Sequence, residues 1–337
     1  MSLKQRVRTN IFTALAAITA ITGLISVPTF AAPQQSVTNS TNVLKISPVR
    51  TDIQIAPGAN KSVPVTISNL TGSAIKVSAI ENDFVAGDEK GTPSLILDAS
   101  QYAPTHSLKR FMTPLSDVTV PAGGAVTVNV LITVPSNAQA GGYFGAVRFA
   151  PSDPNAGGQV NLSASVASLI LLTVPGPTVE KLSLTNFEIQ QKGKNSTYFS
   201  TPDNLQIYAR FENNGNVQEG PYGQVTVQEG KKILSTTDFN TKTPRDVILP
   251  DSARYWNIPL SKVGTIGHFT VSATFTYGQN NQTIDVTRSF WVIPLWAIIA
   301  AGVAVLLIIG IVLLVIFLIR RNRRHRRMYG RSGHMRY

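Results

Sequence analysis

Residues 121–130 have the sequence PAGGAVTVNV, and this stretch holds the pattern that recurs through most of the chain. Its first four residues favour a turn, because proline fixes its own φ angle and glycine adopts conformations that other residues avoid. After the turn, Val126, Val128 and Val130 alternate with other residues. A period of two places these valines on one face of a β-strand. The stretch therefore predicts a turn followed by a strand with one buried face.

Similar segments on both sides of this stretch predict two domains. Alternating segments occur at 63–67, 75–79, 142–149 and 162–174, and a second series includes 205–211 and 269–275. Between the two series, Val174-Pro175-Gly176-Pro177 breaks the alternation. Short strands with frequent turns are typical of β-sandwiches. We therefore predict an all-β protein with two immunoglobulin-like β-sandwich domains, at residues 43–175 and 179–292.

The last part of the chain begins with an apolar run of 25 residues, Leu295–Ile319. As a helix this run would be about 37 Å long, against roughly 30 Å for the hydrocarbon core of a bilayer. Arginine follows at once, at Arg320, Arg321, Arg323, Arg324, Arg326 and Arg327. Short basic flanks of a span stay in the cytoplasm. The sequence thus predicts a single C-terminal transmembrane α-helix at 295–319, a basic cytoplasmic tail at 320–337, and both sandwiches outside the cell membrane.

The N-terminus has the features of a secretory signal peptide. Lys4, Arg6 and Arg8 precede an apolar stretch from Ile11 to Val27, and Thr29-Phe30-Ala31 fits a small-x-small cleavage site. We expect a signal peptide at residues 1–31 and a polar linker at 32–42. The alternative is an uncleaved anchor, which would give the chain two membrane spans.

The net charge of +12 is concentrated at the two ends of the chain. Eight arginines lie from Arg320 onward and three basic residues lie near the N-terminus, so 19 of the 30 basic residues remain beside all 18 acidic ones. The region between the ends is therefore almost neutral. The basic tail is expected to contact anionic membrane lipid, and nucleic acid is not an expected partner.

Few residues are available for catalysis or metal binding. The chain has no cysteine, and its histidines are the widely separated His106, His268, His325 and His334. This leaves little material for a Ser-His-Asp arrangement. Asp83, Asp88 and Glu89 lack the spacing of a calcium loop, as does the segment 153–158. We predict no catalytic residue, no metal and no cofactor.

One strand offers a possible binding face. In Tyr143–Phe149, the side chains of Phe144 and Arg148 fall on the same side, opposite Tyr143 and Val147. If Tyr143 and Val147 face the core, an aromatic ring and a guanidinium group share the surface and could bind a sugar or a carboxylate. In the alternative interpretation, Phe144 is covered and Arg148 pairs with a surface acid.

Several segments resemble the WxL-interacting proteins of Gram-positive bacteria. The resemblance rests on Ile46–Arg50, Ile55–Gly58, Val65–Asn69 and Gly142–Gly145 in the first half, and on Phe211–Val217 in the second. The order of signal peptide, two β-domains, membrane helix and basic tail is also similar. The chain differs at Phe111, where the family commonly has tryptophan, and it has no WxL motif itself.

The resemblance implies two immunoglobulin-like domains at the cell surface, the first associated with peptidoglycan and the second with WxL-domain proteins or host ligands. It assigns no binding residue by position. We therefore predict a membrane-anchored, non-enzymatic protein that binds cell-wall polymer, surface partner proteins or both, in adhesion or as an envelope scaffold.

Two alternatives remain open at the level of sequence. The first is a membrane-tethered assembly factor or chaperone-like subunit that acts by strand addition. A long exposed edge strand near Leu162–Val174 would favour it, whereas a covered or charged edge would favour a binding protein. The second alternative is an extracellular hydrolase.

Overall fold

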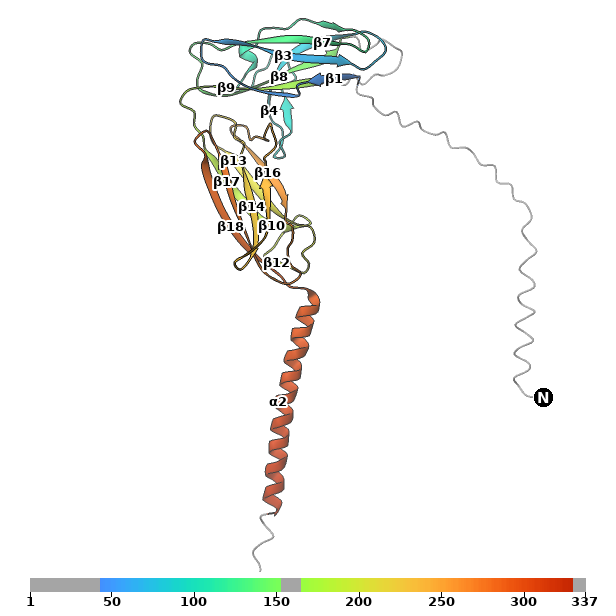
Figure 1. Ribbon diagram of the computed structural model, residues 1–337, viewed down its shortest axis with the longest axis vertical. Coiled ribbons are helices and arrows are strands. Elements are labelled where there is room, and N and C mark those ends of the chain that lie inside the picture. Colours follow the sequence, from blue (N-terminus) through green and yellow to red (C-terminus); the bar gives the residue numbers. More distant parts are fainter. Residues whose placement is uncertain (1–42, 153–164, 330–337) are drawn as a thin grey trace, which may run out of the picture. The chain divides into compact units, whose positions relative to one another are not determined.

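A computed structural model describes residues 43–152 and 165–329, with side chains described as far as Arg321. The predicted signal peptide, the predicted linker and the loop 153–158 lie outside the described residues. The described chain consists of two β-sandwiches and one C-terminal helix, α2 (Figure 1). The all-β fold class with a C-terminal helix, as predicted, is confirmed.

The first sandwich packs a three-stranded sheet against a larger one. The small sheet has the order β1-β3-β7, from β1 (Leu44–Ser47), β3 (Asn60–Asn69) and β7 (Ala125–Thr133). The larger sheet has the order β2-β9-β8-β4-β5, from β2 (Arg50–Gln54), β9 (Val166–Val174), β8 (Gly141–Pro151), β4 (Ile75–Ala86) and β5 (Pro93–Leu95). Two short elements complete it: β6 (Val118–Val120), which pairs with β4, and the 3-10 helix η1 (Lys109–Phe111).

The core of the first sandwich follows from the alternation in the sequence. In β3, Val63, Val65 and Ile67 are at most 2% exposed, and they belong to one buried cluster with Phe149 and Leu172 of the other sheet. Side chains of successive strand residues point to opposite faces, so the residues between them face away from this core. The same alternation in β7 buries Val130 and Ile132, as the valine pattern predicts.

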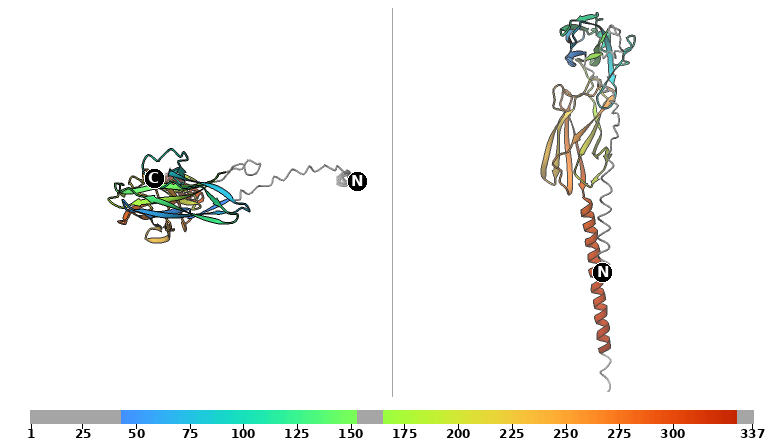
Figure 2. Two further views of the ribbon diagram at one scale, coloured as in Figure 1. Left: turned by 90° about the horizontal axis from the view of Figure 1, so that it is seen from above. Right: turned by 90° about the vertical axis from the view of Figure 1, so that its right-hand side faces the viewer.

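The second sandwich packs a four-stranded sheet against a five-stranded one. The first has the order β11-β10-β13-β16, from β10 (Leu182–Gln191), β11 (Lys194–Asn195), β13 (Leu205–Asn213) and β16 (Ser252–Pro259). The other has the order β12-β18-β17-β14-β15, from β12 (Tyr198–Phe199), β14 (Tyr222–Glu229), β15 (Lys232–Phe239), β17 (Gly267–Tyr277) and β18 (Gln282–Val292). Figure 2 shows the strands of this sandwich from two further directions. The strand order is that of an immunoglobulin-like sandwich.

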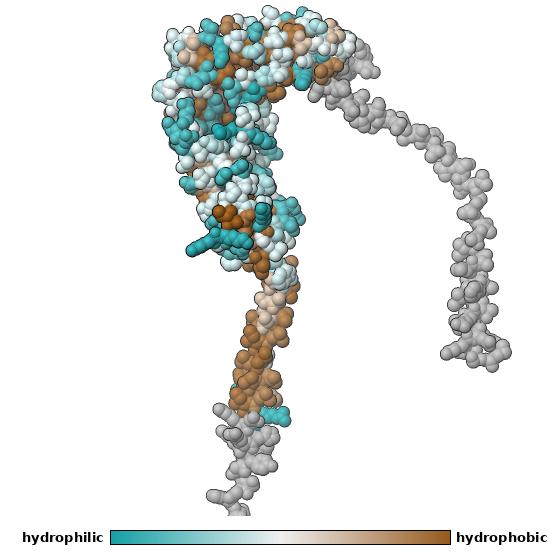
Figure 3. Space-filling model, in the orientation of Figure 1, coloured by the Kyte–Doolittle hydropathy of each residue, from teal (hydrophilic) through white to brown (hydrophobic). Residues whose placement is uncertain are grey.

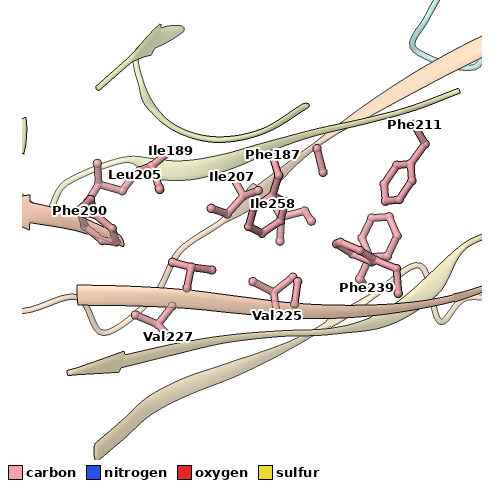
Figure 4. Packing of buried hydrophobic residues seen from close by; sticks show 14 of the residues in the cluster. Phe187, Ile189, Leu205, Ile207, Phe211, Val225, Val227, Phe239, Ile258 and Phe290 are labelled. Carbon is pink, nitrogen blue, oxygen red and sulfur yellow. The ribbon is translucent and has the colours of Figure 1, made fainter. Parts of the chain in front are cut away.

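Aromatic and branched side chains from both sheets fill the second core. Figure 4 shows Phe187, Ile189 and Ile207 pointing from one sheet toward Val225 and Val227 of the other. At one end of this core the ring centres of Phe211 and Phe275 lie 5.0 Å apart at 88°, an edge-to-face contact that aromatic quadrupoles favour.

Helix α2 spans Leu295–Tyr329 and begins three residues after β18. The segment Leu295–Arg321 is long and apolar enough to cross a membrane, and none of it is buried inside the protein. In Figure 3 this part of the helix is a nearly continuous apolar surface. The helical backbone continues beyond the predicted end at Ile319, through the arginine-rich positions.

Contacts between the two sandwiches are both apolar and polar. Phe84, Phe144 and Leu171 of the first pack with Val247 and Leu249 of the second. Two polar contacts flank this cluster. The Arg210 guanidinium donates to both oxygens of Glu89, at 2.9 and 2.7 Å, and the Gly142 N–H donates to the Asn216 carbonyl at 2.7 Å.

Candidate functional site

Phe144 lies inside the protein and not on a binding face. The residue is 3% exposed, its ring lies 6.0 Å from the ring of Phe84, and Val247 and Leu249 of the second sandwich pack against the cluster that contains it. Arg148 is half-buried and donates its Nε–H to the Asn82 side-chain oxygen at 3.3 Å. The prediction that Phe144 and Arg148 share an exposed face that could bind a sugar is therefore wrong. Strand β8 is covered on both faces, and the alternation within a strand cannot reveal that a second domain covers its other side.

The titratable residues singled out in the sequence have separate structural roles. Asp83 is fully buried and accepts hydrogen bonds from the Ala103 N–H, the Ser107 hydroxyl and the Lys109 N–H, at 2.6–2.9 Å. His106 contacts the Gly142 carbonyl, and the His268 ring lies against Trp291 in the other sandwich. In the described part of the chain, no group of three His, Cys, Asp or Glu side chains could hold a metal ion.

The predicted membrane-flanking arginines all belong to the last turns of α2. Arg320 and Arg321 are exposed on the helix. The backbone at Arg323, Arg324, Arg326 and Arg327 is helical, and their side chains lie outside the described part of the structure.

A free sheet edge is the most distinctive feature of the first sandwich. Strand β7 pairs with β3 along its whole length, from Ala125 opposite Ser68 to Thr133 opposite Asn60. On its other side, the described residues form only one bridge, between Met112 and Ile132. From Ala125 to Asn129 the outer edge of β7 therefore has none of the described strands beside it.

The register identifies which backbone groups face outward. The Gly124 carbonyl accepts the Asn69 N–H of β3 at 2.9 Å, while the Leu131 carbonyl points the other way and accepts the Thr113 N–H at 3.0 Å. In an antiparallel strand, successive residues direct both backbone groups to alternate sides. Ala125, Thr127 and Asn129 thus present their N–H and C=O groups to solvent.

Other long edges in the described structure carry features that discourage pairing. Strand β15 contains Lys232 and Asp238, with a bulge in its pairing to β14, and β16 contains Arg254 and ends in Pro259. Charges, prolines and bulges are the usual protection of edge strands. Strand β7 has the sequence AVTVNVLIT, with no charge and no proline, and its register with β3 has no irregularity.

The edge near Leu162–Val174, which we used to distinguish two functions, is covered where it is described. Strand β9 has β8 on one side and β2 on the other, with Arg50 to Gln54 parallel to Leu169 to Thr173. This edge is therefore closed to strand addition between Leu169 and Thr173. The open edge lies instead on the other sheet, at β7.

The sequence contained part of the information that identifies the β7 edge. The run AVTVNVLIT predicts a strand and shows that it lacks charge. Its position at the end of the order β1-β3-β7 depends on strand pairing, which alternation alone does not specify. Residues 125–129 were consequently missed as site residues.

Comparisons with known proteins give structural similarity only. No family model matches the chain, and no curated protein matches it. The class 5 fimbriae chaperone CfaA has 13% identity and a TM-score of 0.37, covering 75% of this chain and 100% of that one. The E. coli chaperone DraB has 14% identity and a TM-score of 0.33, covering 74% of this chain and 96% of that one. Similarities with TM-scores below 0.5 carry no conclusion about function.

Proposed function

We propose that this protein is a membrane-anchored surface protein that binds an extended segment of a partner protein at the outer edge of β7. The observation that carries the proposal is the row of backbone groups at Ala125, Thr127 and Asn129 that no described residue pairs with, on a strand without charge or proline. The role is non-enzymatic and belongs to the assembly or organisation of a surface complex. Cell-wall polymer is not part of the proposal, because Phe144 is buried and gives no stacking surface.

Strand addition would use the geometry of the small sheet directly. A segment antiparallel to β7 would exchange hydrogen bonds with three residues and extend the order β1-β3-β7 by one strand. Main-chain hydrogen bonds supply affinity in this mode, and alternate side chains supply specificity. Val126 and Val128 lie on the core-facing side of β7, beside its outer edge. The segment that fits best therefore alternates β-branched apolar residues with uncharged polar ones.

The proposed location follows from the C-terminal part of the chain, which holds the helix and the arginines. Helix α2 is the anchor, and the arginines from Arg320 onward keep the C-terminus in the cytoplasm. The two sandwiches then lie outside, where they meet other envelope proteins. The resemblance to WxL-interacting proteins makes a WxL-domain protein one partner of the proposed kind.

A crosslinking experiment in the native membrane tests this function. A photoreactive amino acid replaces Asn129 in the full-length protein, and Thr127 is changed either to proline or to alanine. Thr127→Pro removes an outward N–H, whereas Thr127→Ala keeps the whole backbone and loses only the side chain. The same photoreactive amino acid at Thr236, on the charged edge strand β15, is the positional control.

The proposal expects one defined crosslinked species from position 129, retained by Thr127→Ala and lost with Thr127→Pro. It also expects no such species from position 236. Equal crosslinking in the alanine and proline variants would contradict strand addition, since the backbone donor would then be irrelevant. The same species from both positions would contradict the choice of β7.

A further inference from the structure

A second candidate site lies between the two sandwiches, and no residue of β7 lines it. It is an open cavity of about 570 Å³, within the size range of small-ligand sites. Strand β2 contributes Arg50 and Asp52, and the second sandwich contributes most of the remaining wall. Its charged and aromatic lining residues are Arg50, Asp52, Glu180, Glu219, Arg245, Tyr222 and Tyr277.

Glu219 is the unusual member of this lining. The residue is 3% exposed, and its backbone pairs with Ile248 through N–H···O bonds of 3.0 and 2.8 Å. Its Oε2 accepts the Gly278 N–H at 3.1 Å, but its buried Oε1 has no hydrogen-bond partner among the described residues. A buried carboxylate oxygen without a partner is costly, so a donor group brought to this atom by a ligand would stabilise it.

A second carboxylate, that of Glu180, binds the same turn as Glu219. Both oxygens of Glu180 accept the Gln279 N–H, at 3.0 and 3.1 Å, one residue after the glycine that binds Glu219. Gly278 has φ +71°, and a side chain there would collide with the Glu180 carboxylate. Burial, and secondarily the charge of Glu180, raises the pKa of Glu219 to about 7. The pair therefore forms a partly buried acidic subsite.

The basic groups of the cavity are not equivalent. The Arg50 guanidinium donates to both oxygens of Asp52, at 2.8 and 2.7 Å, and to the Arg245 carbonyl at 2.9 Å. The exposed Arg245 guanidinium instead lies over the Tyr222 ring, 3.7 Å from its centre, and makes no ion pair with a carboxylate among the described residues. Arg245 is thus the cation with donors left for an anion.

We propose that this cavity binds a zwitterionic peptide, with its ammonium group between Glu219 and Glu180 and its carboxylate on Arg245. An ammonium group supplies the donor that the Glu219 Oε1 lacks and relieves the repulsion between the two carboxylates. The guanidinium of Arg245 can hold a carboxylate through two parallel N–H···O bonds. The two tyrosines, Tyr222 and Tyr277, provide apolar walls between these ends.

Calorimetry with three related peptides tests the proposal on the full-length protein in lipid nanodiscs. Glycylglycine has both charged ends, N-acetylglycylglycine lacks the ammonium group, and glycylglycinamide lacks the carboxylate. We expect glycylglycine to bind most tightly and the acetylated peptide about ten- to hundredfold more weakly, as for a lost charged hydrogen bond. Titrations at pH 7 in two buffers of different ionisation enthalpy should show proton release, because a bound ammonium ion stabilises the ionised form of Glu219.

Substitutions assign these effects to residues. Glu219→Gln should abolish the proton release and weaken glycylglycine binding at least tenfold, whereas Glu229→Gln, an exposed residue outside the cavity, should change neither. Arg245→Ala should weaken binding of glycylglycine but not of glycylglycinamide. Glu180→Gln serves as the second acidic variant if Glu219→Gln does not fold. Equal binding of the acetylated peptide, no binding of glycylglycine at millimolar concentration, or wild-type behaviour of both acidic variants would overturn the proposal.

Discussion

Glu219 combines a role in backbone pairing with a buried carboxyl group. Its main chain is part of a β-bridge, while its side chain is a buried carboxyl with one oxygen bound by Gly278 and the other unpartnered. Such a group keeps its proton to a higher pH than an exposed carboxyl does, since burial disfavours the charged form. The stability of the folded protein must then depend on the ionisation of this residue.

We expect stability to fall as the pH rises through the range in which Glu219 ionises. Its pKa is raised from an ordinary value of 4.5 to about 7, so between these values the folded state holds a proton that the unfolded state has lost. The contribution of Glu219 is therefore fully present below about pH 4.5 and is lost as the pH approaches and passes 7, by at most about 3 kcal/mol. Urea unfolding of the wild type and Glu219→Gln at pH 5 and pH 8 measures this. The variant should gain stability relative to the wild type at pH 8, and an unchanged difference between the two pH values would contradict it.

Phe144 should act on stability and not on ligand binding. Because its ring is buried among Phe84, Leu171 and the second sandwich, Phe144→Ala should cost about 3–5 kcal/mol through the cavity it leaves. Arg148→Ala, on the same strand face, should cost about 1 kcal/mol, for the hydrogen bond to Asn82. Denaturant unfolding compares the two. A small effect of Phe144→Ala would show that its ring is exposed.

At the scale of elements, β7 differs from other edges because its exposed backbone is not protected by its sequence. The strand has a regular register with β3 and contains no charged residue, so the groups of Ala125, Thr127 and Asn129, unpaired within the described part of the chain, lie on an uninterrupted pairing surface. Edges of this kind promote association with another strand. We interpret the lack of protection as the basis of binding.

The register of β7 with β3 allows a test that compares proline at an outward-facing position with proline at an inward-facing one. Thr127→Pro removes an N–H that faces solvent and should change stability by less than about 1 kcal/mol. Val128→Pro removes an N–H directed at Val65 of β3 and should cost about 1–3 kcal/mol or more, because a buried acceptor loses its donor. Thermal unfolding of both variants checks the assignment. A larger loss from Thr127→Pro would mean that the outward and inward positions are exchanged.

The sequence predicts the positions of the strands better than it predicts which strands pair with one another. Alternation identified segments such as 63–67, 126–130 and 269–275, because the contrast between a core face and an outer face is local. Sheet order depends on contacts between residues far apart in the chain, such as β2 beside β9. The outer face of β8 looked solvent-exposed for the same reason, since residues 247 and 249 that cover it lie about a hundred positions away.

The site residues were harder to predict than the fold. Glu219 lies in an irregular segment between β13 and β14, where no pattern indicates burial, and its hydrogen-bond donor Gly278 comes from another hairpin. The β7 edge consists of backbone groups, which every residue possesses. Neither site is therefore marked by a distinctive residue type, although AVTVNVLIT was recognisable as an uncharged strand.

At the scale of the whole molecule, we propose that the two sandwiches and the apolar helix form a tethered binding protein. In this proposal the helix attaches the β7 edge and the interdomain cavity to a membrane, and the two are separate surfaces for partners. Of the two, the cavity is formed by both sandwiches and depends on their contact, whereas the β7 edge depends only on the first sandwich.

The arginines after the helix should determine its orientation. Replacing the six arginines from Arg320 to Arg327 with glutamine removes the basic flank that we propose retains this end in the cytoplasm. We expect a mixed or inverted orientation in a protease-protection assay on intact cells, while the wild type exposes only its sandwiches to protease. Retention of one orientation by the substituted chain would contradict this role of the tail.

Hydrogen exchange of the β7 amides tests the central claim most directly. In the isolated full-length protein, the Val126 and Val128 amides should exchange slowly and the Thr127 and Asn129 amides quickly, because only the first two are bonded to β3. In the complex isolated from the native membrane, Thr127 and Asn129 should become as protected as their neighbours. Fast exchange at Thr127 and Asn129 in both states would contradict binding by strand addition at this edge.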